Sequence, residues 1–450
     1  DGEALSHNYV KSQLDVLKAA GIPTLVVTGN HDWGTSNAKY YNGASTTSAA
    51  TLTMSELATL YADYGFGSSE REATTLTYAC EPISGLVVIG IDSGSDGSLS
   101  STTLTWVCNK AKDAYNDGKQ VIALMHHPLI PHFTGADTFA ESVSIADYAT
   151  VRNALADAGI RVIFTRHFHT SDIAKDFNAD LSREIYDVNT GSLISYPCDY
   201  RTLSISADLS TIDIATNSVT ELTADDGFAN TAKTRLTASA RQILINKGIT
   251  DPMATTFAGA YIYHAEGDEA DNADAQTFLT IYGTSLAEPI KSLAYSMLQD
   301  KSNYGVAERE NTTADRTLEV TMPTLTESIT LATDGWSTYC SNQTLDLSNT
   351  AGVTGYIVSL VSTETVTLQE VNTIPAETGF ILHGTGSNTY LLHATLNDAD
   401  DVDDNLLIGT LAITPAPASS YALSTKSDVT GFYPVQTGLN IPAHKAYLVT

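Results

Sequence analysis

Basic residues, cysteines and long apolar runs are all scarce in this chain of 450 residues. Lys and Arg number 23 against 52 Asp and Glu, which gives a formal net charge of −29. Sequence-independent binding to nucleic acid, or to anionic lipid, needs a cationic surface, so we expect neither partner. The longest apolar runs, such as residues 121–125, are far shorter than the roughly 20 residues that span a bilayer, so no transmembrane segment is predicted.

The four cysteines, Cys80, Cys108, Cys198 and Cys340, show neither C-x-x-C nor zinc-finger spacing. They are too few for a disulfide framework, and one bridge within the first 200 residues and buried free thiols remain equal alternatives. The low lysine content and many Thr, Ser, Asp and Asn residues favour a secreted, periplasmic or cell-surface location. The chain starts at Asp1 without an initiator Met or an apolar signal-peptide core, so we expect a cut end.

The length predicts about three domains, and a hydrophobic share of 42% is ordinary for a globular protein. We divide the chain into residues 1–217, 218–316 and 317–450. In the first part, apolar residues at Val10 and Leu17 belong to a helical stripe. The sequence further predicts helices at residues 104–114 and 151–158, strands at residues 25–27, 86–91, 121–125 and 162–164, and a strand meander over residues 173–214. Short, fully apolar strands separated by helices indicate an α/β domain whose sheet is covered on both faces.

The rest of the chain separates into a helical part and a β-rich part. Residues 218–316 carry helical periodicity at residues 229–245, 255–263 and 286–298, and we expect the acidic stretch 264–274 to be a solvated loop. Residues 317–450 form short Thr-, Val- and Leu-rich runs between turn residues, which is typical of a β-sandwich-like accessory domain. The acidic run 397–405 lacks the Gly and final Glu of a calcium loop, which favours a solvated turn over a calcium site.

Three histidine-bearing segments each follow an apolar strand. They are Gly29-Asn30-His31-Asp32, His126-His127-Pro128 and Arg166-His167-Phe168-His169. Ligands of open α/β sheets collect beyond the carboxyl ends of strands, so we expect these side chains to meet at one edge. Neutral imidazoles and an amide oxygen suit divalent transition metals. A single His after a strand is more often structural, but three such segments favour a metal site.

These segments, in this order, resemble the later motifs of the calcineurin-like metallophosphoesterase superfamily: GNH(D/E), a strand-end His, and GHxH. The resemblance covers roughly residues 1–215, and the connecting residues are similar to those of secreted bacterial members. It implies a four-layer αββα sandwich for residues 1–217. It also implies hydrolysis of a small-molecule or macromolecular phosphoester by a metal-activated hydroxide in a two-metal site. The C-terminal residues 355–447 resemble β modules that end secreted proteins of gut Bacteroidetes.

Carried over residue by residue, the resemblance implies that Asn30, His126 and His167 ligate one divalent ion and that His169 ligates the other. Mn, Fe, Zn, Mg and Ca all remain open as the metal, since a nitrogen-rich site accepts several first-row ions. Whether the substrate is a mono- or a diester also remains open.

The resemblance further implies that His31 acts as a general acid or stabilises the phosphoryl oxygens, with Asp32 orienting it. Arg166, His127 and His132 are candidates for substrate binding. For the two histidines, a role as bystanders in the surrounding loop is equally open.

Two features depart from the family pattern. The family centre also draws ligands from an upstream Asp-x-His and Gly-Asp, and no Asp-x-His precedes Asn30. We therefore expect the chain to begin just downstream of these motifs and its activity to be impaired. Arg166 replaces the glycine of GHxH. It either fits with a negative φ and holds a phosphate oxygen, or it distorts the loop. The alternative function is a catalytically degenerate phosphoesterase-like scaffold that serves as a surface or binding protein.

Overall fold

The computed structural model describes residues 2–35, 37–133, 144–223, 225, 227–288, 290–299, 314–436 and 438–449. The chain forms two compact units. One comprises residues 1–111 and 120–323, and the other comprises residues 112–119 and 324–450. The first unit is mixed α/β and contains the predicted helical segment 218–316 and the predicted domain 1–217 except residues 112–119. The second unit is built from β-sheets.

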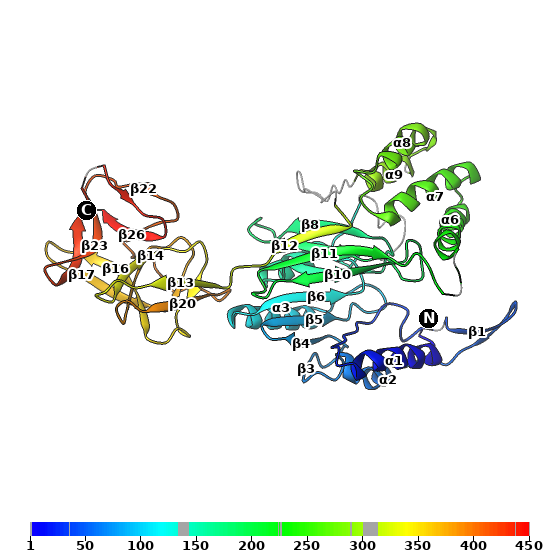
Figure 1. Cartoon of the computed structure of the whole chain (residues 1–450), viewed down its shortest axis with the longest axis horizontal. Helices are drawn as coiled ribbons and strands as arrows, with labels where there is room; N and C mark the ends of the chain where they lie inside the picture. The colour runs from blue at the N-terminus through cyan, green and yellow to red at the C-terminus, as the bar shows by residue number, and fades with distance from the viewer. Residues whose placement is uncertain are drawn as a thin grey trace. The chain divides into compact units, whose positions relative to one another are not determined.

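A seven-stranded mixed sheet forms the centre of the first unit (Figure 1). Its strand order is β3-β4-β5-β6-β7-β9-β8. The central pairings from β5 through β6 and β7 to β9 are parallel, and the outer pairings are antiparallel. The strands are β3 (Glu70–Arg71), β4 (Tyr78–Ile83), β5 (Leu86–Ile91), β6 (Gln120–Met125), β7 (Val162–Thr165), β8 (Asp172–Phe177) and β9 (Glu184–Asn189). The predicted strands at 86–91, 121–125 and 162–164 are therefore parallel neighbours.

A second, antiparallel sheet covers one face of the first. It consists of β10 (Asp199–Ile205), β11 (Thr211–Ser218) and β12 (Thr317–Thr321), in that order. One hydrophobic core joins the two sheets. Its buried residues are Leu86, Val88, Ile122, Val162, Ile173 and Val188 on the large sheet and Ile212, Ile214, Val320 and Met322 on or beside the small one. Burial of these apolar side chains holds the two sheets face to face.

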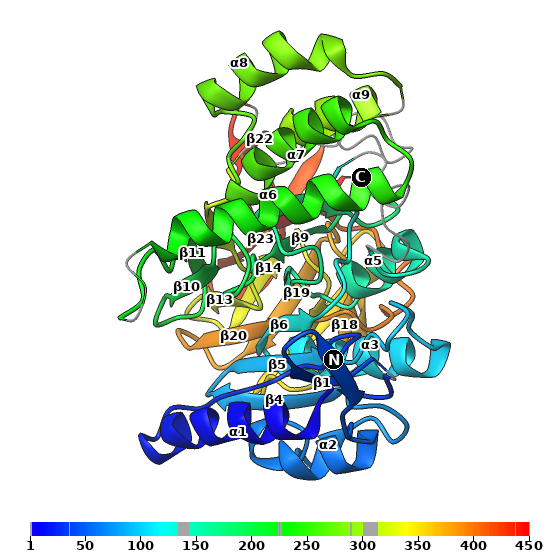
Figure 2. The ribbon, with the colours of Figure 1, turned by 90° about the vertical axis from the view of Figure 1, so that its right-hand side faces the viewer.

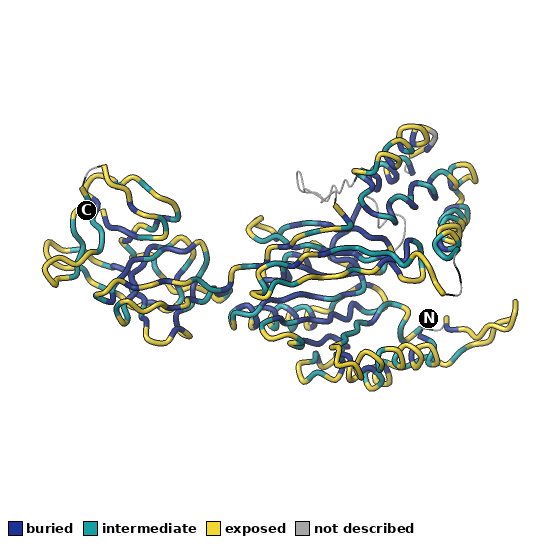
Figure 3. The backbone as a smooth tube through the Cα atoms, in the orientation of Figure 1, coloured by how far each residue is buried: buried dark blue, intermediate teal, exposed yellow. Residues whose placement is uncertain are grey.

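The N-terminal helices lie on the other side of the large sheet (Figure 1). They are α1 (Ala4–Ala19) and α2 (Met54–Leu60); α3 (Ser101–Asn116) and α5 (Tyr148–Asp157) follow in the chain. The predicted first helix is confirmed, and Gly21 follows its end with a left-handed φ of 74°. His7 is the buried residue of α1, and most of the helix is exposed (Figure 3). A short hairpin, β1 (Lys39–Asn42) and β2 (Ser45–Ser48), precedes α2.

Two predictions for this unit are wrong. Residues 25–27 are extended but form no strand in the described part of the chain. The Val26 N–H donates to the carbonyl of Tyr64, in the short 3₁₀ helix η1 (Ala62–Tyr64), over 2.9 Å, and the Val26 carbonyl accepts the Tyr78 hydroxyl over 2.9 Å. A 3₁₀ helix and a side chain therefore take the place of a neighbouring strand. The meander of residues 173–214 is divided: β8 and β9 complete the large sheet, whereas β10 and β11 begin the second sheet.

The predicted helices of residues 218–316 are present and gather at one end of the two sheets (Figures 1 and 2). The predicted helices correspond to α6 (Phe228–Asn246), α7 (Asp251–Glu266) and α9 (Ile290–Leu298), and α8 (Ala273–Tyr282) is a further helix that the sequence did not predict. The start of α7 follows from Thr250 as N-cap and Pro252 in the first turn. The expectation of a solvated loop at 264–274 is wrong. His264 lies in the last turn of α7 with 1% exposure, and its ring contacts the carboxyl group of Glu269, which is also buried.

The second unit contains three four-stranded antiparallel sheets and a two-stranded one. Their orders are β13-β20-β15-β18, β14-β19-β16-β17, β21-β26-β23-β24 and β22-β25. Alternation along β16 explains the layering: Ile357 packs into the core shared with the first sheet, and Val358 packs into the core shared with the third. The bounds are β13 (Thr326–Thr330), β14 (Trp336–Tyr339), β15 (Leu345–Asp346), β16 (Val353–Val361), β17 (Val366–Val371), β18 (Thr373–Ile374), β19 (Phe380–Gly384), β20 (Thr389–Ala394), β21 (Ile408–Thr410), β22 (Thr414–Pro415), β23 (Ser420–Lys426), β24 (Val429–Pro434), β25 (Asn440–Ile441) and β26 (Lys445–Val449).

The four cysteines form no disulfide in this structure; Cys198 and Cys340 are buried, whereas Cys80 and Cys108 are partly buried. No helix within the described residues has the length and apolar character needed to cross a bilayer.

Candidate metal centre

The second and third histidine segments follow neighbouring parallel strands. β6 and β7 pair with Leu124 opposite Phe164, so the two strands end side by side. The backbone N–H of Arg166 then donates to the His126 carbonyl oxygen over 3.0 Å. This register fixes the residues just beyond the two strands opposite one another, as the strand-end prediction required.

Asn30, His126 and His167 converge. The Nε2 atom of His126 lies 3.0 Å from Asn30 Oδ1 and 3.0 Å from His167 Nδ1. Donor atoms that share one tetrahedral ion at about 2.1 Å are about 3.4 Å apart. Both distances from His126 Nε2 therefore need to lengthen by only about 0.4 Å to match a shared tetrahedral ion.

His127 belongs to the same cluster. One ligand atom each from His126, His127 and His167 lie within 4.8 Å of one another. The His127 ring is buried, and its Nδ1 lies 2.7 Å from the Ser93 hydroxyl. Its Nε2 has no hydrogen-bond partner among the described residues. Metal-ligating imidazoles usually have their second nitrogen held in this way. A divalent cation thus fits a donor set in which a buried nitrogen is otherwise left without a partner.

Burial keeps these imidazoles neutral. Desolvation, followed by the charges of His127 and His167, lowers the pKa of His126 to about 2. Desolvation and His167 lower the pKa of His127 to about 4. Both rings are therefore unprotonated at neutral pH, which is the form that binds a metal.

Gly29 allows the Asn30 loop to approach His126. A Cβ atom at Gly29 would meet the His126 ring at 2.8 Å, closer than real Cβ contacts. Any larger residue would therefore push the ring away from Asn30 Oδ1. The glycine of the GNH motif has a steric role here, because its backbone passes against a ligand ring.

The loop after β7 has a strained backbone. His167 and His169 have φ angles of 36° and 61°, in the left-handed region that side chains other than Gly and Asn rarely adopt. Arg166 is not among the residues with positive φ, so the substitution for glycine fits the backbone. Its guanidinium donates to the Ser192 hydroxyl over 2.7 Å. Local strain of this kind often occurs at functional sites.

His169 lies near Arg166 and His31. Desolvation, then the charges of Arg166 and His31, lower the pKa of His169. The structure thus gathers these three predicted site residues beside the cluster. Their predicted roles as ligand, substrate-binding residue and general acid stay predictions.

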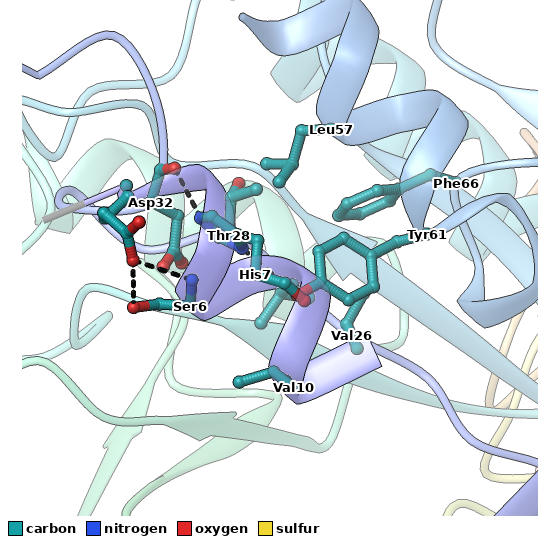
Figure 4. A pocket seen from close by; sticks show the side chains of 12 residues that line it. Ser6, His7, Val10, Val26, Thr28, Asp32, Leu57, Tyr61 and Phe66 are labelled. Atoms are coloured by element: carbon teal, nitrogen blue, oxygen red, sulfur yellow. Dashed lines mark hydrogen bonds between the residues drawn. The ribbon is translucent and has the colours of Figure 1, made fainter. Parts of the chain in front are cut away.

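The loop that carries Asn30 and Asp32 is anchored from α1. The Asp32 carboxylate accepts the Gly29 N–H over 2.7 Å, which closes the turn. The His7 ring lies between the Asp32 carbonyl oxygen, 2.8 Å from Nε2, and the Tyr61 hydroxyl, 3.1 Å from Nδ1 (Figure 4). The Asp32 carboxylate therefore holds the loop backbone, whereas its predicted role of orienting His31 stays a prediction.

His132 lies in a buried ionic group. Its Nδ1 is 2.9 Å from the Asp172 carboxylate and its Nε2 is 3.3 Å from the Asp187 carboxylate. Burial opposes a charge on the ring, but the two carboxylates outweigh it and raise the pKa of His132 to about 10. Desolvation likewise disfavours an ionised Asp172, yet His132 lowers its pKa. The structure thus gives His132 two carboxylate partners, and its predicted place in the substrate pocket finds no support in these contacts.

Sequence reasoning missed two positioning residues, Ser93 and His7. Ser93 comes directly after the predicted strand 86–91, so the strand-end rule that selected the histidines also indicated it. His7 had no such signal, because its partners Asp32 and Tyr61 are distant in the sequence.

No protein-family model matches this sequence, and no curated protein matches it. Among solved structures, the chain is similar to a dimetal phosphatase from Danio rerio. The two are 12% identical over 47% of this chain and 75% of that chain, with a TM-score of 0.35.

Proposed function

We propose that this protein is a metal-dependent phosphoester hydrolase whose centre lies beyond the ends of β6 and β7. The observation that carries the proposal is the convergence of Asn30 Oδ1, His126 Nε2 and His167 Nδ1, with the unpartnered Nε2 of His127 beside them. We also propose that the two packed sheets with outer helices are the αββα sandwich that the histidine motifs imply.

The donor set suits a first-row divalent ion. A cation held there supplies Lewis acidity that lowers the pKa of a water molecule and neutralises phosphate charge. Asn30, His126 and His167 would hold it, with His127 as a further nitrogen donor, and Ser93 fixes the ring orientation of His127. His169 is the candidate ligand for a second ion.

The remaining site residues handle the substrate. To the exposed His31 we assign the role of protonating the leaving alkoxide oxygen or stabilising the phosphoryl oxygens. Arg166 supplies a guanidinium that binds a phosphate oxygen, and Ser192 orients it from the loop after β9. His167 and His169 both have positive φ angles, so the backbone at these two residues has the strained conformation found at many functional sites.

The test combines metal content with turnover. Wild-type protein, His126→Ala and the control His393→Ala, which alters a histidine on β20 of the second unit, are loaded with Mn²⁺ or Zn²⁺. Hydrolysis of p-nitrophenyl phosphate and bis-p-nitrophenyl phosphate is then measured. We expect weak turnover in wild type and control, because no Asp-x-His precedes Asn30 in this chain, and loss of turnover in His126→Ala. Equal rates in all three would contradict the proposal, and metal binding without turnover would favour the scaffold alternative.

A further inference from the structure

An apolar cavity of about 270 Å³ lies beside the proposed centre. Its walls come from the helical segment and from the two loops that follow β6 and β7. No Asp, Glu, Lys or Arg is among the described residues that line it. The residues that line the cavity include Phe168, His169, Ser195, Ala240, Phe257 and Tyr261.

The cavity exists because the helices α6, α7 and α9 pack onto the site loops. Phe133, which follows β6 by eight residues, belongs to the buried core of these helices, and Phe168 packs against it. The Phe133 and Phe168 rings are 5.3 Å apart, and Phe168 and Tyr261 are 6.1 Å apart, edge to face. The Tyr261 hydroxyl donates to the Phe168 carbonyl oxygen over 3.3 Å. The helical segment therefore fixes the loop that carries His167 and His169.

One wall of the cavity is shared with the centre. Phe168 and His169 line the cavity, and His167, one residue earlier, lies 3.0 Å from His126 Nε2. The loop after β9 continues the connection. Arg166 holds Ser192, and Ser195 lines the cavity three residues later. A phosphate bound near Arg166 and His169 would therefore direct its ester substituent toward the apolar space.

Volume and polarity define what fits. An apolar cavity of about 150 Å³ holds one benzene molecule, so 270 Å³ admits a bicyclic aromatic group or a short alkyl chain. Burial raises the pKa of Tyr261 to about 12, so its ring stays neutral. With no charged residue in the lining, the group that enters is uncharged.

We propose that this cavity binds the apolar alcohol portion of the substrate, so that the preferred phosphoesters carry an aromatic or short alkyl leaving group. The proposal rests on the proposed hydrolase function for the position of the phosphate. It assigns the helical segment to substrate selection, because α6, α7 and α9 supply most of the lining. The reaction is hydrolysis: water adds to phosphorus, the phosphorus–oxygen ester bond breaks, and the apolar alcohol leaves with a proton.

A matched pair of variants on α6 tests the proposal. Ala240→Phe places a ring in the cavity, whereas Ala238→Phe places it on an exposed position of the same helix that does not line the cavity. Phosphate release is measured from 1-naphthyl phosphate and from glycerol 2-phosphate. The two phosphoesters differ in intrinsic reactivity. This difference cancels when the ratio of their kcat/KM values is compared between each variant and wild type. We expect Ala240→Phe to lower the kcat/KM selectivity for the naphthyl substrate at least about tenfold, the lower end for one altered apolar contact, and Ala238→Phe to retain wild-type selectivity.

Binding of 1-naphthol to metal-free protein, followed by naphthol fluorescence, separates this proposal from the hydrolase function. We expect wild type and Ala238→Phe to bind naphthol and Ala240→Phe to lose binding. Ser239→Phe, at an exposed lining position, replaces Ala240→Phe if circular dichroism shows that the latter does not fold. Absence of naphthol binding to wild type, or equal effects of Ala240→Phe on both phosphoesters, would overturn the cavity proposal. No turnover of either phosphoester by wild type would contradict the hydrolase instead, and the naphthol titration would still decide the cavity.

Discussion

Raising the pH above neutrality is expected to destabilise the first unit through His132. The ring is buried between the Asp172 and Asp187 carboxylates, and these raise its pKa to about 10 in the folded protein. In the unfolded chain a histidine has a pKa of about 6.5. Because the folded-state value is the higher one, the stabilisation is complete below pH about 6.5 and is lost as the pH rises through about 10.

The magnitude follows from linkage. One proton held more tightly over about 3.5 pH units, at about 1.4 kcal/mol per unit, gives at most about 5 kcal/mol. That is comparable to the whole free energy of unfolding of many domains. Replacing His132 by Leu at pH 6 leaves Asp172 and Asp187 buried without their cation, and removal of one partner from a buried pair costs about 3–5 kcal/mol.

Urea unfolding followed by helical circular dichroism measures this effect, because the helices lie almost entirely in the first unit. We expect the wild-type unfolding free energy to fall between pH 6.5 and 10, and the His132→Leu curve to be lower at pH 6 and flatter across the range. The difference between the curves isolates His132 from other groups that titrate. Parallel pH profiles for wild type and variant would refute the reasoning.

Three further changes test the site and the fold. Ser93→Ala frees His127 Nδ1 and should weaken binding of Zn²⁺ by roughly 10- to 100-fold in calorimetric titration; unchanged affinity would show that the hydroxyl does not orient the ring. Gly29→Ala should also weaken Zn²⁺ binding, because its Cβ displaces the His126 ring; an affinity equal to wild type would refute the steric argument. Thr53→Ala removes the capping box of α2 and should lower the unfolding free energy by about 0.5–2 kcal/mol. An unchanged urea midpoint would contradict this capping role of Thr53.

Local patterns predicted the centre of the fold well. The apolar run 86–91 is β5 with the same bounds, because a strand buried on both faces needs only apolar side chains. The same pattern misled at residues 25–27, since a strand also needs a neighbour, and Val26 bonds to Tyr64 and Tyr78 instead. The apolar pattern is a property of the segment itself, whereas hydrogen bonding to a neighbouring strand depends on residues far away in the chain.

The sequence predicted the position of the candidate site but not all of its contacts. Strand ends indicated His126 and His167, but no sequence rule shows which nitrogen of His127 is left free; that depends on Ser93, across the parallel pair of β5 and β6. The surroundings of His132 depend on Asp172 and Asp187, which lie on β8 and β9, so the local sequence could not show that two carboxylates enclose its ring.

The most direct measurement is anomalous X-ray scattering at the zinc edge from crystals of the protein equilibrated with Zn²⁺. We expect a strong peak within about 2.0–2.2 Å of Asn30 Oδ1, His126 Nε2 and His167 Nδ1. Crystals that show no zinc among these three side chains, or zinc bound only at other positions, would contradict it.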